Sequence, residues 1–135
     1  MKPFLTGLAL LCLTGLCAAA APNRIFMDEL DLSPIRQGWG EPQARQSVAK
    51  KPLTLGGKTY ERGVGLHTPG TFFIVLDGSA SRFSALTGVD GGVGDRGTVT
   101  LTIFADGARV FDSGVMRGGG APMKIDFPLS GVRSM

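Results

Sequence analysis

The sequence predicts an all-β domain folded as a β-sandwich or jelly roll. Apolar and polar residues alternate in several short runs, which is the period of a half-buried strand. Turn-forming residues separate these runs, and 19 of the 21 glycines lie beyond residue 21. No stretch shows helical periodicity over three turns, and Ser33 to Gln37 would form one turn at most.

The predicted strands follow one another at close spacing. Gly56-Gly57 and Asp106-Gly107 each separate two such runs and predict hairpins, because two-residue hairpin turns require positive φ angles. In residues 98–105, three threonines alternate with Val99, Leu101 and Ile103. In chain order, the predicted strands are residues 52–55, 58–60, 71–76, 82–87, 98–105, 108–111 and 123–127.

Residues 1–21 have the features of a secretory signal peptide. Lys2 is followed by an apolar run from Phe4 to Cys17 and by small residues that end before Pro22. The run is shorter than the roughly 20 apolar residues that a membrane-spanning helix usually needs. We therefore expect a leader over residues 1–21 and one domain over residues 22–135. The alternative is a lipid-modified Cys17. Leu16 disfavours this alternative, because lipid modification of a cysteine would require a small residue at this position.

Cysteine and charge content narrow the classes of function. Both cysteines, Cys12 and Cys17, lie in the leader, so the domain has no disulfide and suits a periplasmic or secreted bacterial protein. Beyond the leader, 13 basic and 11 acidic residues are scattered. A nucleic-acid binder would show a basic face with interleaved aromatic residues. The sequence therefore predicts no nucleic-acid partner and no membrane surface once the leader is removed.

Two glycine-rich patterns in the middle of the chain carry little chemical information. Residues 92–97 match GxGxxG, but a β-like run follows where a dinucleotide site needs a helix. Residues 91–95 are similar to a calcium-binding nonapeptide repeat, but the spacing is one residue short and the pattern occurs only once in the chain. A loop between strands is the preferred interpretation, with Asp90 or Asp95 as candidates to contact an ion or a ligand.

The sequence offers few catalytic groups. His67 is the only histidine, so a site of several histidines is impossible, and no Gly-x-Ser-x-Gly elbow accompanies it. Asp28, Glu29 and Asp31 form an acidic cluster that could in principle supply the two carboxylates of a glycosidase. Neighbouring residues of a strand point to opposite faces, so we interpret this cluster as a solvated edge.

Trp39 and His67 are the best candidates for ligand contacts. Trp39 is the only tryptophan and lies between two glycines, where an indole could stack on a sugar ring or close one end of the core. His67 follows Gly63 and Gly65, and it is either a packed core residue or a hydrogen-bonding group for a ligand. Composition and spacing leave both alternatives open for each residue.

A series of stretches over roughly residues 25 to 133 follows the order of one family. In them the chain resembles the NPCBM-type carbohydrate-binding module, a galactose-binding-like β-sandwich, in the form found ahead of melibiase-like α-galactosidase domains of secreted bacterial enzymes. The matching stretches are residues 30–33, 36–40, 60–67, 83–90, 97–99, 105–107 and 111–119.

The resemblance implies non-catalytic binding of galactose-containing glycans beside a tethered glycosidase domain, which raises the local concentration of substrate. It implies a structural calcium ion without assigning ligands to it. On this basis we expect Trp39 to stack on the sugar. We expect His67, Asp90 and Arg96 to supply hydrogen bonds from loops.

The chain differs from the family pattern in two places. Gly91 follows Asp90 where the family usually has a second acidic residue. The family also continues with another apolar strand, so we expect a sandwich that lacks its last strand or strands, with an exposed edge. The alternative functions are a fragment of an α-galactosidase-type glycoside hydrolase, a small glycosidase in its own right, and a protein-interaction or adhesion sandwich.

Overall fold

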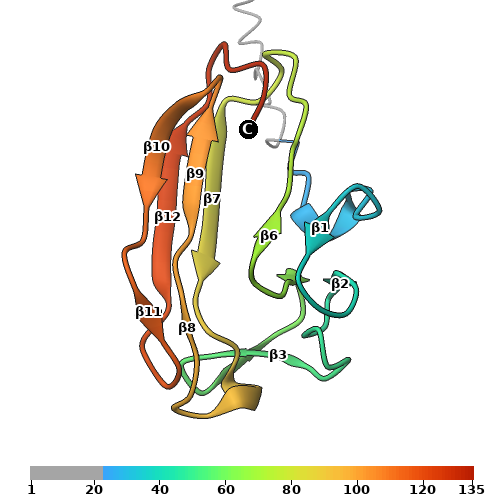
Figure 1. Ribbon diagram of the computed structural model, residues 1–135. Helices are drawn as coiled ribbons and strands as arrows, with labels where there is room; N and C mark the ends of the chain where they lie inside the picture. The colour runs from blue at the N-terminus through green and yellow to red at the C-terminus, as the bar shows by residue number, and fades with distance from the viewer. Residues whose placement is uncertain (1–22) are drawn as a thin grey trace, which may run out of the picture.

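The computed structural model of the protein describes residues 23–135, and within them the secondary structure consists of short antiparallel strands and two single 3-10 turns (Figure 1). The turns are η1 (Met27–Glu29) and η2 (Gly91–Val93). The expected all-β class is therefore confirmed. The predicted leader lies outside the described residues.

The first half of the described chain forms three small antiparallel pairs. Strand β1 pairs with β6, β2 with β5, and β3 with β4, and each pair contributes only two or three residues per strand. Loops therefore make up most of this half. The strands are β1 (Arg36–Gln37), β2 (Gln43–Ala44), β3 (Leu53–Leu55), β4 (Lys58–Tyr60), β5 (Val64–Gly65) and β6 (Gly70–Thr71).

The second half forms two longer ribbons and one short pair, which run beside one another in Figure 1. Strand β7 pairs with β12 over six residues, β9 pairs with β10, and β8 pairs with β11. These ribbons carry most of the buried apolar residues. The strands are β7 (Arg82–Thr87), β8 (Thr98–Val99), β9 (Thr102–Ala105), β10 (Ala108–Asp112), β11 (Met116–Arg117) and β12 (Met123–Pro128).

Both predicted hairpin turns are confirmed. Gly56 and Gly57 have φ angles of 56° and 78°, and Asp106 and Gly107 have φ angles of 48° and 81°. Positive φ at both central residues is the geometry of a type I′ turn, which matches the twist of the flanking strands. The carboxylate of Asp106 also accepts the backbone N–H of Ser134 at 2.9 Å, which ties this turn to the end of the chain.

Two predicted strands differ from the structure. Residues 98–105 form β8 and β9 with a break at Leu101, because the Leu101 N–H donates to the Ser113 hydroxyl at 2.8 Å instead of continuing the ladder. Of residues 71–76, only Thr71 belongs to an assigned strand, β6. Ile74 instead exchanges backbone hydrogen bonds with Met135 at 2.7 and 2.9 Å.

The core lies along the inner face of the β7–β12 ribbon. The register places Ile125 opposite Ala85 and Phe127 opposite Phe83, and the two phenylalanine rings lie 5.5 Å apart. Ile125 is only 1% exposed. Burial of such a side chain contributes about 2 kcal/mol. Ile35, the residue before β1, is also buried and anchors the start of that strand.

Candidate functional site

Trp39 and His67 lie together on two loops that the β1–β6 pair brings side by side. Trp39 follows β1, and His67 lies between β5 and β6; Gln37 of β1 pairs with Gly70 of β6. The ring centroids of Trp39 and His67 are 5.7 Å apart, with their planes inclined at 59°. Trp39 is 62% exposed, and His67 is also exposed. The core interpretation of both residues is therefore wrong.

The side chain of Gln37 holds the two loops together. Its amide nitrogen donates to the carbonyl oxygen of Trp39 at 2.9 Å, and its amide oxygen accepts the backbone N–H of His67 at 3.1 Å. Both bonds fix the backbone of an exposed aromatic residue, so the two rings are presented in a set relation. Sequence reasoning missed this role, although Gln37 lies within the family-like stretch that contains Trp39.

The glycines on either side of Trp39 explain its exposure. A Cβ atom on Gly38 would lie 2.8 Å from the Pro69 ring and 3.0 Å from the carbonyl oxygen of Thr68. Only glycine allows this approach, and the Gly38 N–H donates to Pro69 at 2.8 Å. Gly40 has a φ angle of 65°, which then turns the chain away. The loop therefore lies against residues 68–69 and leaves the indole in solvent.

A shallow hollow of about 320 Å³ lies beside this loop. An exposed indole can stack on the flat apolar face of a ring, and nearby amide and backbone groups can bind its polar substituents. The hollow and the aromatic pair together therefore suit a small, hydroxyl-rich ligand. The hollow is lined by Arg36, Gln37, Gly38, Pro69, Gly70 and Thr71.

Asp90 and Arg96 lie in a different part of the molecule. Asp90 precedes η2, which lies beside β3 at the lower end of the view in Figure 1, whereas β1 lies higher. The Asp90 carboxylate accepts the N–H of Gly92 at 2.8 Å and that of Thr54 at 3.1 Å, so it caps η2 and joins it to β3. Arg96 is exposed. Within residues 23–135, no hydrogen bond or ion pair joins either residue to Trp39 or His67.

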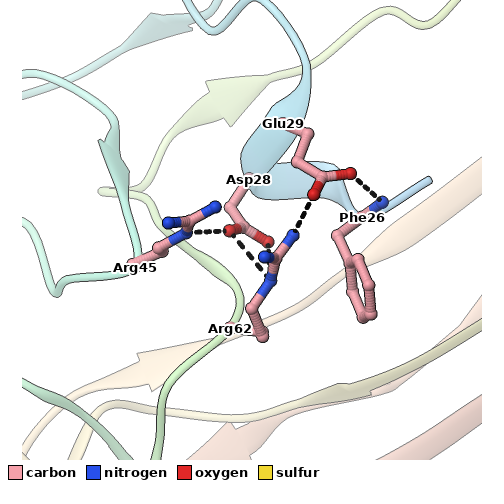
Figure 2. Close-up of polar contacts among 5 residues, drawn as sticks. All are labelled: Phe26, Asp28, Glu29, Arg45 and Arg62. Atoms are coloured by element: carbon pink, nitrogen blue, oxygen red, sulfur yellow. Dashed lines mark hydrogen bonds and ion pairs between the residues drawn. The ribbon is translucent and has the colours of Figure 1, made fainter.

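Asp28 is buried in an ion-pair cluster with two arginines (Figure 2), whereas Glu29 and Asp31 are exposed, as the solvated edge predicted. The Asp28 side chain is 1% exposed; its carboxylate lies 2.6 Å from Nε of Arg45 and 3.2 Å from Nε of Arg62. Arg62 also bonds Glu29 at 2.7 Å and lies over the Phe26 ring at 4.0 Å. The expected solvated edge is thus wrong for Asp28, because two distant arginines fold onto it.

The electrostatics of this cluster favour its charged form. Burial would raise the pKa of Asp28, but the hydrogen bond from Arg45 and the charges of Arg62 and Arg45 together lower it below its ordinary value. The hydrogen bonds from Arg62 and from the Phe26 N–H lower the pKa of Glu29 as well. The cluster ties η1 to the segment between β4 and β5 that leads to His67.

Among residues 23–135, no group of three or more histidine, cysteine, aspartate or glutamate residues is arranged to hold a metal ion. Calcium also binds through backbone and amide carbonyl oxygens, so the calcium ion stays an expectation drawn from the family resemblance. In the same part of the chain, no helix is long and apolar enough to cross a membrane.

This chain matches a short part of two much longer curated proteins. The chain is 31% identical over 102 residues to a Renibacterium salmoninarum protein named as an endo-alpha-N-acetylgalactosaminidase, which covers 71% of this chain and 7% of that protein. It is 29% identical over 104 residues to alpha-1,3-galactosidase B of Akkermansia muciniphila, which covers 74% of this chain and 13% of that protein.

Solved structures share the fold, and a family model matches all described residues. The CBM51 domain of a Clostridium perfringens GH95 protein, in complex with methyl-galactose, superposes with a TM-score of 0.75 at 24% identity, over 82% of this chain and 81% of that one. The CBM51-2 domain of C. perfringens ZmpB, in complex with GlcNAc and solved with its INT domains, gives 0.75 at 18% identity, over 81% and 25%. The galactose-binding-like β-sandwich expected from the sequence is thus confirmed. The NPCBM/NEW2 domain model matches residues 23–135, and the chain belongs to that family.

Proposed function

We propose that the protein is a non-catalytic carbohydrate-binding module for galactose-containing glycans, and that Trp39 is its central contact. The observation that carries this proposal is the 62% exposed indole set 5.7 Å from the His67 ring. Exposure alone does not distinguish Trp39, because Phe73 is 66% exposed; the paired ring of His67 and the bonds from Gln37 that hold both loops are what favour a ligand.

The groups around Trp39 suit a galactose-type ring. The indole stacks on the apolar face of the sugar, and the His67 ring, beside it on the neighbouring loop, bonds a hydroxyl group. The solved neighbour that binds methyl-galactose and the relatives named for galactosidase and galactosaminidase activities support the same class of sugar. Asp90 and Arg96 stay predicted contacts from a second loop.

The carboxylates near residue 28 support binding rather than hydrolysis. A glycosidase needs one carboxyl group that donates a proton and a second that acts as base or nucleophile. Asp28 and Glu29 are both held by arginines, and their lowered pKa values make them poor proton donors near neutral pH. They are therefore structural groups.

The module serves an exported glycosidase in this proposal. The chain spans only 7% and 13% of the curated relatives that it matches, which are named as an endo-alpha-N-acetylgalactosaminidase and an alpha-1,3-galactosidase. A module that holds such a glycan keeps a tethered catalytic domain at a high effective concentration of substrate. The signal peptide predicted over residues 1–21 would direct the protein to the periplasm or the exterior.

The test is a glycan-binding titration of wild type and Trp39→Ala. Loss of one stacking aromatic should weaken binding of methyl galactoside about tenfold or more. Phe104→Ala is the matched control, because Phe104 is 51% exposed on β9 and should leave affinity unchanged. Equal affinity of wild type and Trp39→Ala would remove Trp39 from the site. A glycan array without any hit, beside capture of a periplasmic protein, would favour the interaction module instead.

A further inference from the structure

Residues 72–76, which we call the open edge, form an extended segment whose backbone is paired on one side only. Ile74 exchanges backbone hydrogen bonds with Met135 at 2.7 and 2.9 Å. Successive residues of an antiparallel ladder turn their N–H and C=O groups to opposite sides, so Phe73 and Val75 turn theirs away from Met135. Among the described residues, neither of these two N–H groups makes a hydrogen bond. The backbone groups on this side of the edge are therefore available to another strand.

Strand β1 occupies the same side only before the open edge begins. Arg36, the first residue of β1, pairs with Thr71. Ahead of Arg36 the chain turns away, because the N–H of Ile35 donates to the carbonyl oxygen of Leu32 at 3.1 Å. In Figure 1 the chain runs on from β6 past β1. The ladder that β1 forms with β6 therefore stops short of the open edge.

The side chains of the open edge lack the usual protection of an edge strand. Phe73 is 66% exposed and Val75 is 64% exposed, whereas Phe72, Ile74 and Leu76 alternate with them and are half-buried. Natural edge strands are commonly protected by charged side chains or proline. The open edge has neither, since all of its residues are apolar. An edge of this composition favours pairing with a further strand.

A second copy of the chain fits the open edge in one register. Two such edges can meet antiparallel about a two-fold axis at Ile74, and Phe73 of each copy then lies opposite Val75 of the other. These two residues exchange N–H···O=C hydrogen bonds across the axis, because theirs are the backbone groups that the edge leaves open. An aromatic side chain opposite a β-branched one is also a favourable cross-strand pair. The edge is therefore complementary to itself.

The charges at the ends of the open edge suit the same register. The edge ends where Asp77 and Gly78 turn the chain with φ angles of 49° and 74°. In the two-fold register, Asp77 of one copy comes opposite Thr71 of the other, where Arg36 begins β1. Asp77 and Arg36 are both exposed, and neither forms an ion pair among the described residues. Each copy thus brings a carboxylate toward a guanidinium of the other, and no like charges meet along the edge.

We infer that the open edge is an interaction surface for a second copy of this chain, and that the two copies form a symmetric dimer through one antiparallel ladder. Because β1 lies beside only one end of the edge, antiparallel pairing places the two Trp39 loops at opposite ends of the joined edges. A surface that carries many glycans would then be held at two points. Only this consequence rests on the proposed sugar binding; the pairing of the two edges does not.

The test is the mass of the full chain in solution, measured by sedimentation equilibrium. We expect a reversible doubling of mass as the protein concentration rises, with or without methyl galactoside. Phe73→Lys combined with Val75→Lys should abolish the doubling, because like charges then face each other across the axis. Phe73→Glu combined with Val75→Glu should abolish it as well. A mixture of the two double variants should restore the doubling, since lysine then faces glutamate in the proposed register.

Phe104→Lys is the matched control, because Phe104 is 51% exposed on β9, whose backbone is already paired with β10. It should leave the doubling unchanged. Circular dichroism verifies that each variant is folded, and amide exchange in wild type should slow at Phe73 and Val75 as the dimer forms. This measurement tests the edge without any substitution.

A wild-type chain that stays monomeric at every concentration would overturn the proposal and leave the open edge to a strand of another protein. The proposed register is wrong if the mixture of folded double variants stays monomeric. A mass that grows beyond two copies would contradict the dimer too, because a two-fold contact uses each edge once. These results are independent of sugar binding, so they leave the proposed function to its own titration.

Discussion

The Trp39 loop and the Asp28 cluster place their most informative side chains in opposite environments. The indole of Trp39 is 62% exposed, and its position comes from backbone contacts and from Gln37. The carboxylate of Asp28 is 1% exposed, and two arginines from distant loops compensate its charge. A charged group in the interior is unfavourable without partners, whereas an exposed indole beside a second ring offers an apolar face that a ligand can cover.

The two side chains differ in whether the chain itself supplies their partners. Every partner of Asp28 belongs to the chain, so the cluster is complete and stabilises the fold. The free face of Trp39 has no comparable partner among residues 23–135, and a shallow hollow lies beside its loop. A complete cluster indicates structure, whereas an incomplete one indicates a ligand. Mutations at the two places should therefore separate stability from binding.

Asp28→Ala should give the largest effect on stability. Removal of the carboxylate leaves Arg45 and Arg62, whose side chains are 54% and 36% exposed, without their shared partner, so we expect the free energy of unfolding to fall by about 2 kcal/mol. Chemical denaturation measures this change. Arg109→Ala is the control; it breaks one exposed pair with Asp112 and should cost less than about 1 kcal/mol. Similar losses in the two variants would contradict a structural role of the cluster.

Acid should weaken the same cluster without a mutation. A carboxyl group whose folded-state pKa is lowered contributes stability above its unfolded pKa, and this contribution is lost as the pH falls through the folded pKa. The pKa of Asp28 is lowered from 3.8, so the unfolding free energy should hold above about pH 4 and decline below it. Denaturation from pH 7 to 2 should show a smaller decline in Asp28→Asn. Identical pH curves for wild type and Asp28→Asn would show that Asp28 does not cause the loss of stability in acid.

Asp90→Ala should produce a smaller loss of stability. The variant removes the acceptor for the Gly92 and Thr54 N–H groups, and loss of a cap of this kind costs about 1 kcal/mol. Asp90 also stays a predicted sugar contact, so a folded Asp90→Ala protein should bind methyl galactoside more weakly. An unchanged affinity would remove Asp90 from the site and leave its carboxylate as a cap of η2 alone.

Trp39→Ala should have the smallest effect on stability although it has the largest effect on binding. An exposed side chain contributes little packing, so the free energy of unfolding should change by less than about 0.5 kcal/mol. Because Trp39 is the only tryptophan, unfolding of this variant is followed by circular dichroism. A loss above 2 kcal/mol would show that the indole supports the fold, and the contrast with Asp28 would fail.

Local signals predicted the parts of the fold that depend on neighbouring residues. The turns at Gly56-Gly57 and Asp106-Gly107 are set by φ angles, and the alternation in residues 82–87 appears unchanged as the half-buried face of β7. The break in residues 98–105 escaped prediction because it depends on Ser113, which lies twelve residues away from Leu101. Ile74 likewise bonds Met135 across most of the domain.

The all-β class, the two hairpins, the family resemblance and the candidates Trp39 and His67 could all be predicted from the residues in order. The folded chain was needed to show that these two rings meet in solvent, that Asp28 is buried between two arginines, and that Asp90 caps η2. The difference comes from distance along the chain. A turn is fixed by its own residues, whereas exposure and charge compensation depend on segments that meet only after folding.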